Sequence, residues 1–167
     1  MKSRVVPQKL VRQFSPAVRE PFRRWAEYMY EHVPFNMPNS HFHAYAHCER
    51  VLLYALLLAD KIQPGDEEAQ KILAHAAIFH DTRRIDENRD TGHGARAAEF
   101  YETFCREHPE LPYRPESACI MHWHDRYKGR PIDEVANEIL APWLFPYTEQ
   151  PPTELRTLTY TMAEGYA

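Results

Sequence analysis

Apolar residues recur at helical intervals along almost the whole chain, and this spacing limits its fold more than any other feature. The first stripe consists of Val18, Phe22, Trp25 and Met29. These positions share one face of a helix. The helix is expected to begin at Ser15-Pro16 and to end near Val33-Pro34, because proline suits a first helical turn and the residue before a proline avoids helical geometry.

The same spacing predicts further helices downstream. They are expected at about 44–61, at 66–80 with Asp66 as its cap, from Thr91-Gly92 to about Phe104, from Pro115 onward, and over a short stretch around Val135. No alternating strand pattern occurs before Pro142, so we expect an all-α fold with about six helices over residues 1–141. Residues 142–167 contain four prolines and are expected to form an irregular segment.

Charge and composition exclude several function classes. A net charge of −4 and a pI near 6.2 offer no field that gathers nucleic acid or anionic membrane. The longest apolar run, Val51 to Ala59, is too short to cross a bilayer, and no secretory signal is recognisable. Three cysteines without a Cys-x-x-Cys pair indicate a reducing compartment. We therefore expect a cytoplasmic protein that binds neither nucleic acid nor membrane, with homo-oligomerisation left open.

The pair His80-Asp81 stands at the end of an alanine-rich apolar run, residues 72–79. Two polar side chains at the end of a buried helix are costly to bury without a partner, and a divalent cation is the partner that suits them best. Imidazole and carboxylate ligands favour zinc, iron, manganese, cobalt or nickel, and magnesium is also considered. Further histidines adjoin neighbouring helix-like segments: His47, His93, His122 and His124.

Four motifs follow one another in the chain: His43–Val51, Phe79–Arg84, Gly92–Ala98 and Ala118–His122. In this order they resemble the HD-domain superfamily of metal-dependent phosphohydrolases, in particular its small bacterial single-domain members. The resemblance implies a bundle of five or more helices around a metal, with His47, His80 and Asp81 as the first three ligands. It also places His93 and His122 at positions that bind a second metal or the substrate phosphate in some members, with His124 as a competitor for the latter.

The chain departs from the family where the closing aspartate ligand is expected. The late helix should continue there, but residues 140–146 read Leu-Ala-Pro-Trp-Leu-Phe-Pro. Asp125 or Asp133 could substitute, a partner chain or the medium could supply the ligand, or the site could be incomplete. Asp125 is the candidate fourth ligand, because Ala118, His122 and Asp125 follow at i, i+4 and i+7 on one expected helix face.

The chemistry that such a site supports is hydrolysis of a phosphate ester on a nucleotide or another small phosphorylated metabolite. The candidate catalytic residues are Asp81, His93, His122 and Arg84. The guanidinium of Arg84 beside a metal would hold a phosphate, and the histidines would orient it or protonate the leaving oxygen. The alternatives are a di-iron oxygenase of HD-like fold and a non-catalytic HD-like module. His41 and His43 fit a solvated loop and a supporting position equally well.

Overall fold

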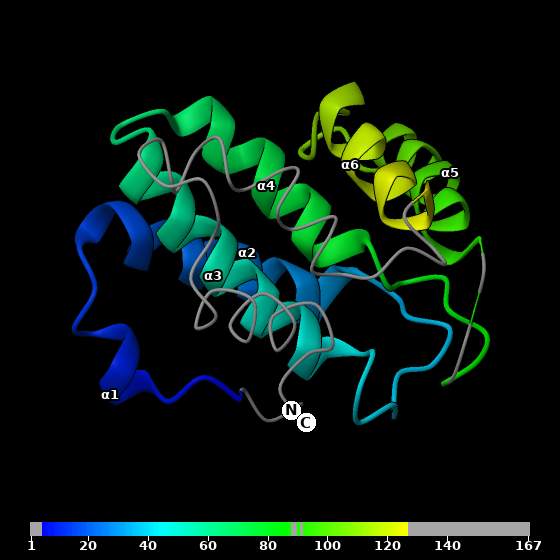
Figure 1. The fold of residues 1–167 in the computed structure, drawn as a ribbon, viewed down its shortest axis with the longest axis horizontal. Helices are drawn as coiled ribbons and strands as arrows, with labels where there is room; N and C mark the ends of the chain where they lie inside the picture. Colours follow the sequence, from blue (N-terminus) through cyan, green and yellow to red (C-terminus); the bar gives the residue numbers. More distant parts are fainter. Residues whose placement is uncertain (1–4, 88–89, 91, 127–167) are drawn as a thin grey trace, which may run out of the picture. The chain divides into compact units, whose positions relative to one another are not determined.

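A computed structural model describes residues 5–87, 90 and 92–126, with side chains to residue 122. This part of the chain forms six helices and no strand: α1 (Gln8–Val11), α2 (Pro16–His32), α3 (Tyr45–Ile62), α4 (Glu67–Phe79), α5 (His93–Glu107) and α6 (Pro115–Arg126) (Figure 1). The all-α prediction is confirmed for these residues. None of these helices is long and apolar enough to cross a membrane.

The helices agree with the sequence expectations except at the two ends of the chain. The short α1 was not expected, since four residues are too few to show a period. The helix expected around Val135 and the irregular segment 142–167 lie outside the described residues, and so does the boundary at residue 141.

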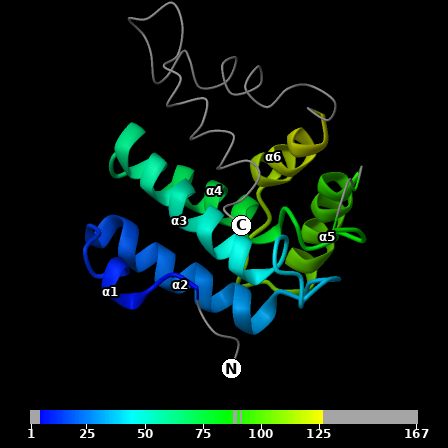
Figure 2. The same cartoon turned by 60° about the horizontal axis from the view of Figure 1, so that its bottom comes forward.

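Helices α2, α3 and α4 form the centre of the bundle, with α3 packed on both of the others (Figure 2). The inward face of α2 carries the predicted stripe Val18, Phe22, Trp25 and Met29, all of it buried. Helix α3 buries Leu52, Leu53 and Leu56 against it. Removing these apolar surfaces from water is the main force that holds the helices together.

Local signals fix where α4 begins. Gly65 has a φ of +82°, a left-handed conformation that side-chain-bearing residues rarely adopt, and it turns the chain after α3. Asp66 then accepts a hydrogen bond from the Ala69 amide at 2.9 Å, which caps α4 as predicted. The short connection makes α3 and α4 a helical hairpin.

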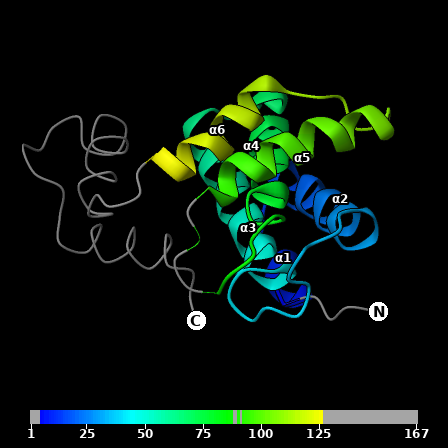
Figure 3. The same ribbon diagram turned by 90° about the vertical axis from the view of Figure 1, so that its right-hand side faces the viewer.

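This hairpin decides where a site can form, because it brings the start of α3 next to the end of α4. The segment after α4 then leads to the start of α5 (Figure 3). A backbone hydrogen bond of 2.9 Å from the Asn36 amide to the Thr82 carbonyl attaches the segment before α3 to the same region. Three helix ends and two loops therefore meet around residues 80 and 81.

Candidate metal centre

His47, His80 and Asp81 converge at the meeting point of α3 and α4. His47 lies in the first turn of α3, His80 directly follows α4, and Asp81 is the next residue. His47 Nε2 lies 3.2 Å from His80 Nε2, and Asp81 Oδ2 lies 3.6 Å and 3.7 Å from these two atoms. All three side chains are buried. The predicted convergence of residues separated by 33 positions is confirmed.

The distances among these three atoms fit a common metal ion. A point equidistant from atoms separated by 3.2, 3.6 and 3.7 Å lies about 2.0 Å from each of them. This distance equals the usual bond length from a transition metal to histidine nitrogen or carboxylate oxygen. The separations of the three ligand atoms therefore suit one shared ion.

Hydrogen bonding sets the ring nitrogens of His80 in the form that a metal requires. Its Nδ1 lies 2.8 Å from the Ala77 carbonyl oxygen, which can only accept, so Nδ1 carries the proton. The Nε2 of the neutral ring then presents a lone pair toward His47. A backbone carbonyl that orients a histidine in this way is the usual support of a metal ligand.

His47 faces the same point as a neutral ring. Burial, reinforced by the facing His80, lowers the pKa of His47 to about 3. Its Nδ1 is buried and makes no hydrogen bond within the described part of the chain. Its Nε2 can either donate a hydrogen bond to His80 Nε2 or share a cation with it, and two imidazole nitrogens beside a carboxylate oxygen are a donor set that suits a divalent metal.

Asp81 supplies the negative charge of the cluster. Burial raises the pKa of its carboxyl group, but His80, His43, His93 and His47 together hold that pKa well below the usual value. His43 Nδ1 lies 3.2 Å from Asp81 Oδ2, the oxygen that faces the two ligand histidines. His43 therefore adjoins the centre, one of the two positions that the sequence left open for it.

The other carboxylate oxygen of Asp81 faces a second pair of candidate residues. His93 Nε2 lies 3.2 Å and Arg84 Nη1 lies 3.7 Å from Asp81 Oδ1, and these two nitrogens are 3.3 Å apart. His93 Nδ1 lies 2.7 Å from the Asp90 carbonyl oxygen, so the proton of the neutral ring is on that nitrogen. The structure thus brings His93 and Arg84 to the candidate centre, next to Asp81.

Asp90 and Arg96 hold the loop that carries Arg84, although no sequence motif pointed to either residue. Two contacts of 2.7 Å join Arg96 Nη2 to both carboxylate oxygens of Asp90, and the Ile85 amide donates to Asp90 Oδ2 at 2.8 Å. Arg96 also donates from Nε to the Arg83 carbonyl oxygen at 3.1 Å. These bonds explain how a segment without any period is ordered beside the centre. The five residues between Asp90 and Arg96 gave no sequence signal of their pairing.

His122 does not join this group. It lies on α6 with an exposed side chain, while Ala118 and Met121 occupy the buried face of that helix. The expectation that His122 faces the same cavity as the ligands is therefore not met, because the inward face of α6 runs through Met121 instead. The side chains of His124 and Asp125 lie outside the described part, as does all of Asp133.

Comparisons with family models, with curated proteins and with solved structures give no match to this chain. Two imidazoles and one carboxylate converge on a single point, and a guanidinium and two further imidazoles flank the carboxylate. This arrangement can bind a divalent cation and place an anion beside it.

Proposed function

We propose that this chain is a metal-dependent phosphohydrolase of the HD-domain type, acting on a nucleotide or another small phosphorylated metabolite. The observation that carries the proposal is the convergence of His47, His80 and Asp81 on a point about 2.0 Å from each ligand atom. The resemblance of the motif order to that family agrees with this ligand set. A bound divalent ion would polarise the phosphoryl group and lower the pKa of a water molecule toward neutrality.

Arg84 is the residue that we assign to the phosphate. Its side chain is buried, and Nη1 lies 3.7 Å from Asp81 Oδ1 and 3.3 Å from His93 Nε2. A guanidinium in this place can offer parallel donors to two phosphate oxygens while the carboxylate of Asp81 fixes its position. His93 accepts from Arg84 through Nε2 and so serves to orient the guanidinium.

We assign to His43 the donation of a proton to the leaving oxygen. Its side chain is 22 % exposed, the highest value among the four histidines around Asp81. Because Nδ1 faces Asp81, the opposite nitrogen, Nε2, is the atom that can reach a substrate. Nε2 makes no hydrogen bond within the described residues.

The position of Arg84 favours one metal over two. A second ion bridged by Asp81 would bind Oδ1 and His93 Nε2, and the guanidinium of Arg84 lies within 3.7 Å of both atoms. A fixed positive charge there opposes a second cation and favours a phosphate. This observation argues against the di-iron oxygenase, which needs two irons.

The test combines metal analysis with hydrolysis. Protein stripped with a chelator is titrated with Mn²⁺, Ni²⁺ and Zn²⁺, and release of inorganic phosphate from a panel of nucleotides and sugar phosphates is then measured. We expect one equivalent of metal and metal-dependent hydrolysis in the wild type, and neither in Asp81→Ala. His32→Ala is the control, because His32 lies at the exposed end of α2.

Three results would contradict the proposal. Metal-stimulated hydrolysis at wild-type level in Asp81→Ala would exclude this centre. Two equivalents of iron with a mixed-valence signal would support the oxygenase instead. Metal binding without hydrolysis of any phosphate ester in the panel would support the non-catalytic module.

A further inference from the structure

Ser40 joins the two loops that flank Asp81. Its hydroxyl donates a hydrogen bond of 2.9 Å to Glu87 Oε2, which ties the loop before α3 to the loop after α4. The same oxygen accepts from the His43 amide at 2.9 Å and from the Phe42 amide at 3.2 Å. A hydroxyl group offers one hydrogen and two lone pairs, so these three contacts use all of its bonding capacity. We call the hydrogen bond between Ser40 and Glu87 the loop clasp.

The loop clasp lies at the same sequence distance from two residues beside Asp81. Ser40 precedes His43 by three positions, and Glu87 follows Arg84 by three. His43 Nδ1 lies 3.2 Å from Asp81 Oδ2, and Arg84 Nη1 lies 3.7 Å from Asp81 Oδ1. The clasp therefore joins the two segments that carry the groups beside either oxygen of the Asp81 carboxylate.

The two segments differ in what else holds them. The segment that carries Arg84 has an anchor of its own, because the Ile85 amide donates to Asp90 Oδ2 at 2.8 Å. On the other segment, the backbone amide of His43 is held by the Ser40 hydroxyl itself. Loss of that hydroxyl should therefore displace His43 and leave Arg84 in place.

We propose that Ser40 is a positioning residue for proton donation, since its hydroxyl and the loop clasp hold His43 where Nε2 reaches the leaving oxygen. This inference rests on the proposed hydrolase activity and deepens it. In the step concerned, a water oxygen bonds to phosphorus while the bond from phosphorus to the leaving oxygen breaks. The leaving oxygen keeps the bonding electron pair and takes the proton from His43 Nε2, and the proton released by the water restores the ring.

The role of Ser40 bears on the class of ester that the centre can cleave. An alkoxide leaves poorly unless it is protonated, whereas a 4-nitrophenolate anion leaves without a proton, so proton donation matters for the alkoxide. Displacement of a catalytic group by about 1 Å can lower the rate about 100-fold. Ser40 therefore supports the cleavage of alkyl phosphate esters, the class that includes sugar phosphates and nucleoside monophosphates.

The first test compares benzyl phosphate, an alkyl ester, with 4-nitrophenyl phosphate as substrates of the metal-loaded full chain. In Ser40→Ala, kcat for benzyl phosphate should fall at least about tenfold, while kcat for 4-nitrophenyl phosphate changes less than about threefold. KM should change little for either ester, because Arg84 stays in place. Ser40→Thr keeps the hydroxyl and should restore the rate. Glu87→Ala removes the clasp alone and should also lower the benzyl phosphate rate, and Glu87→Gln, which keeps an acceptor oxygen, should restore it.

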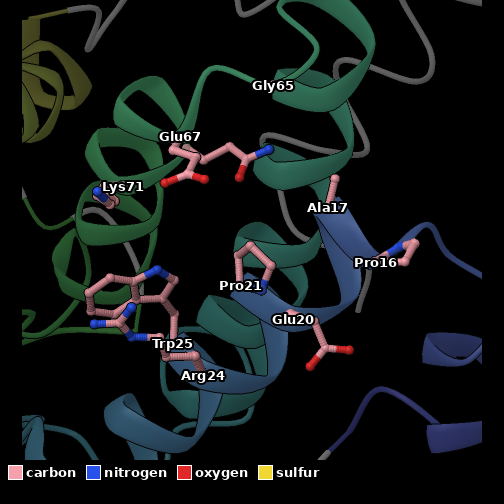
Figure 4. Close-up of a pocket in the computed structure, with 10 residues that line it drawn as sticks. Pro16, Ala17, Glu20, Pro21, Arg24, Trp25, Gly65, Glu67 and Lys71 are labelled. Atoms are coloured by element: carbon pink, nitrogen blue, oxygen red, sulfur yellow. The ribbon is translucent and has the colours of Figure 1, made fainter.

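Two variants away from the loop clasp serve as matched controls. Ser15→Ala removes a hydroxyl whose exposed hydrogen bond of 3.3 Å joins it to Asp60. Glu20→Ala removes an exposed carboxylate that is bound by Arg19, in the wall of the hollow between α2 and α4 (Figure 4). Neither variant should change the ratio of the two rates.

A double variant and NMR distinguish positioning from a general structural role. If Ser40 acts through His43, Ser40→Ala should cause no further loss of benzyl phosphate hydrolysis in a His43→Ala background. In the metal-free protein, the ring nitrogen resonances of His43 are identified by their absence from His43→Ala. They should shift in Ser40→Ala and return in Ser40→Thr. Circular dichroism and metal titration establish that each variant is folded and binds the ion.

Three results would overturn the inference. They are unchanged hydrolysis of benzyl phosphate in Ser40→Ala, an equal loss for both esters, and an additive loss in the double variant. Absence of hydrolysis of both esters by the wild type would instead refute the proposed function. The NMR comparison would then decide by itself, and unchanged His43 resonances in Ser40→Ala would overturn the role of Ser40.

Discussion

Replacing Arg83 by methionine is expected to destabilise the protein without disturbing the candidate metal centre. Arg83 Nη1 lies 3.2 Å from the Pro34 carbonyl oxygen and 3.0 Å from Asn36 Oδ1, and its guanidinium carbon lies 3.3 Å from the Phe100 ring centroid. The side chain thus joins the segment before α3 to the loop after α4. None of these contacts involves His47, His80 or Asp81.

The size of the effect follows from these contacts. Nη1 has two hydrogens, so at most two of its hydrogen bonds form at once, and each contributes about 1 kcal/mol at a half-exposed site. The cation–π contact adds about 0.5–1 kcal/mol, while methionine keeps the apolar part of the packing on Phe100. We therefore expect a loss of about 2–3 kcal/mol of unfolding free energy for Arg83→Met.

Urea denaturation followed by circular dichroism measures this loss. Arg106→Met is the control, because Arg106 is exposed and its contacts are an exposed 3.3 Å hydrogen bond to Thr103 Oγ1 and a 4.0 Å ion pair with Glu102. Its effect should stay within about 0.5 kcal/mol. A loss of unfolding free energy in Arg83→Met as small as that of the control would show that the contacts of Arg83 with Pro34, Asn36 and Phe100 do not stabilise the fold. Loss of metal uptake in a folded Arg83→Met protein would refute the separation of this residue from the centre.

Three further predictions concern the centre and the core. His80→Ala should lose metal uptake in calorimetric titrations. Its helical circular dichroism should stay close to that of the wild type, because apolar packing stabilises the helices. Unchanged metal uptake would exclude His80 as a ligand. Because the described residues bring only three candidate ligands together, bound metal should exchange readily with a chelator. Asp125→Ala should speed this exchange only if Asp125 completes the shell. Because the fold lowers the pKa of His75 to about 4, the unfolded chain takes up a proton at His75 before the folded one as the pH falls. The unfolding free energy should therefore fall by about 2–3 kcal/mol between pH 7 and pH 4.5 through this residue. Urea denaturation of His75→Gln at several pH values should show a decrease that is smaller by this amount, and an equal decrease in wild type and variant would refute the prediction.

The sequence was sufficient to predict the helices that have regular stripes or clear end signals. The stripe from Val18 to Met29 and the cap at Asp66 both agree with the structure. On α6 the sequence predicted His122 on the inward face, whereas the structure buries Met121 there. His122 at i+4 and Met121 at i+3 from Ala118 both fit a helical stripe, so only tertiary packing decides which of the two is buried. The loop after Asp81 has no period, so its pairs could not be derived.

The same distinction applies to the candidate centre. The sequence was sufficient to predict the grouping of His47, His80 and Asp81, because buried polar side chains at the ends of apolar helices need a polar or charged partner. The contacts of His43 and Arg84 with Asp81 depend on how two irregular segments return to the same helix end, which no local pattern encodes.

The buried polar cluster is unfavourable for the fold unless a cation completes it. His47 Nδ1 has no partner in the described part of the chain, and Asp81 Oδ1 makes no hydrogen bond there despite its close nitrogens. Each buried polar atom without a partner costs about 1–3 kcal/mol, which is a sizeable fraction of the stability of a domain. The core around Phe22, Leu56 and Phe79 is fully buried and offsets this cost, so the cluster can persist in the folded chain. A local conflict of this kind is expected at a functional site, and a bound metal would give His47 Nε2, His80 Nε2 and the Asp81 carboxylate a common partner.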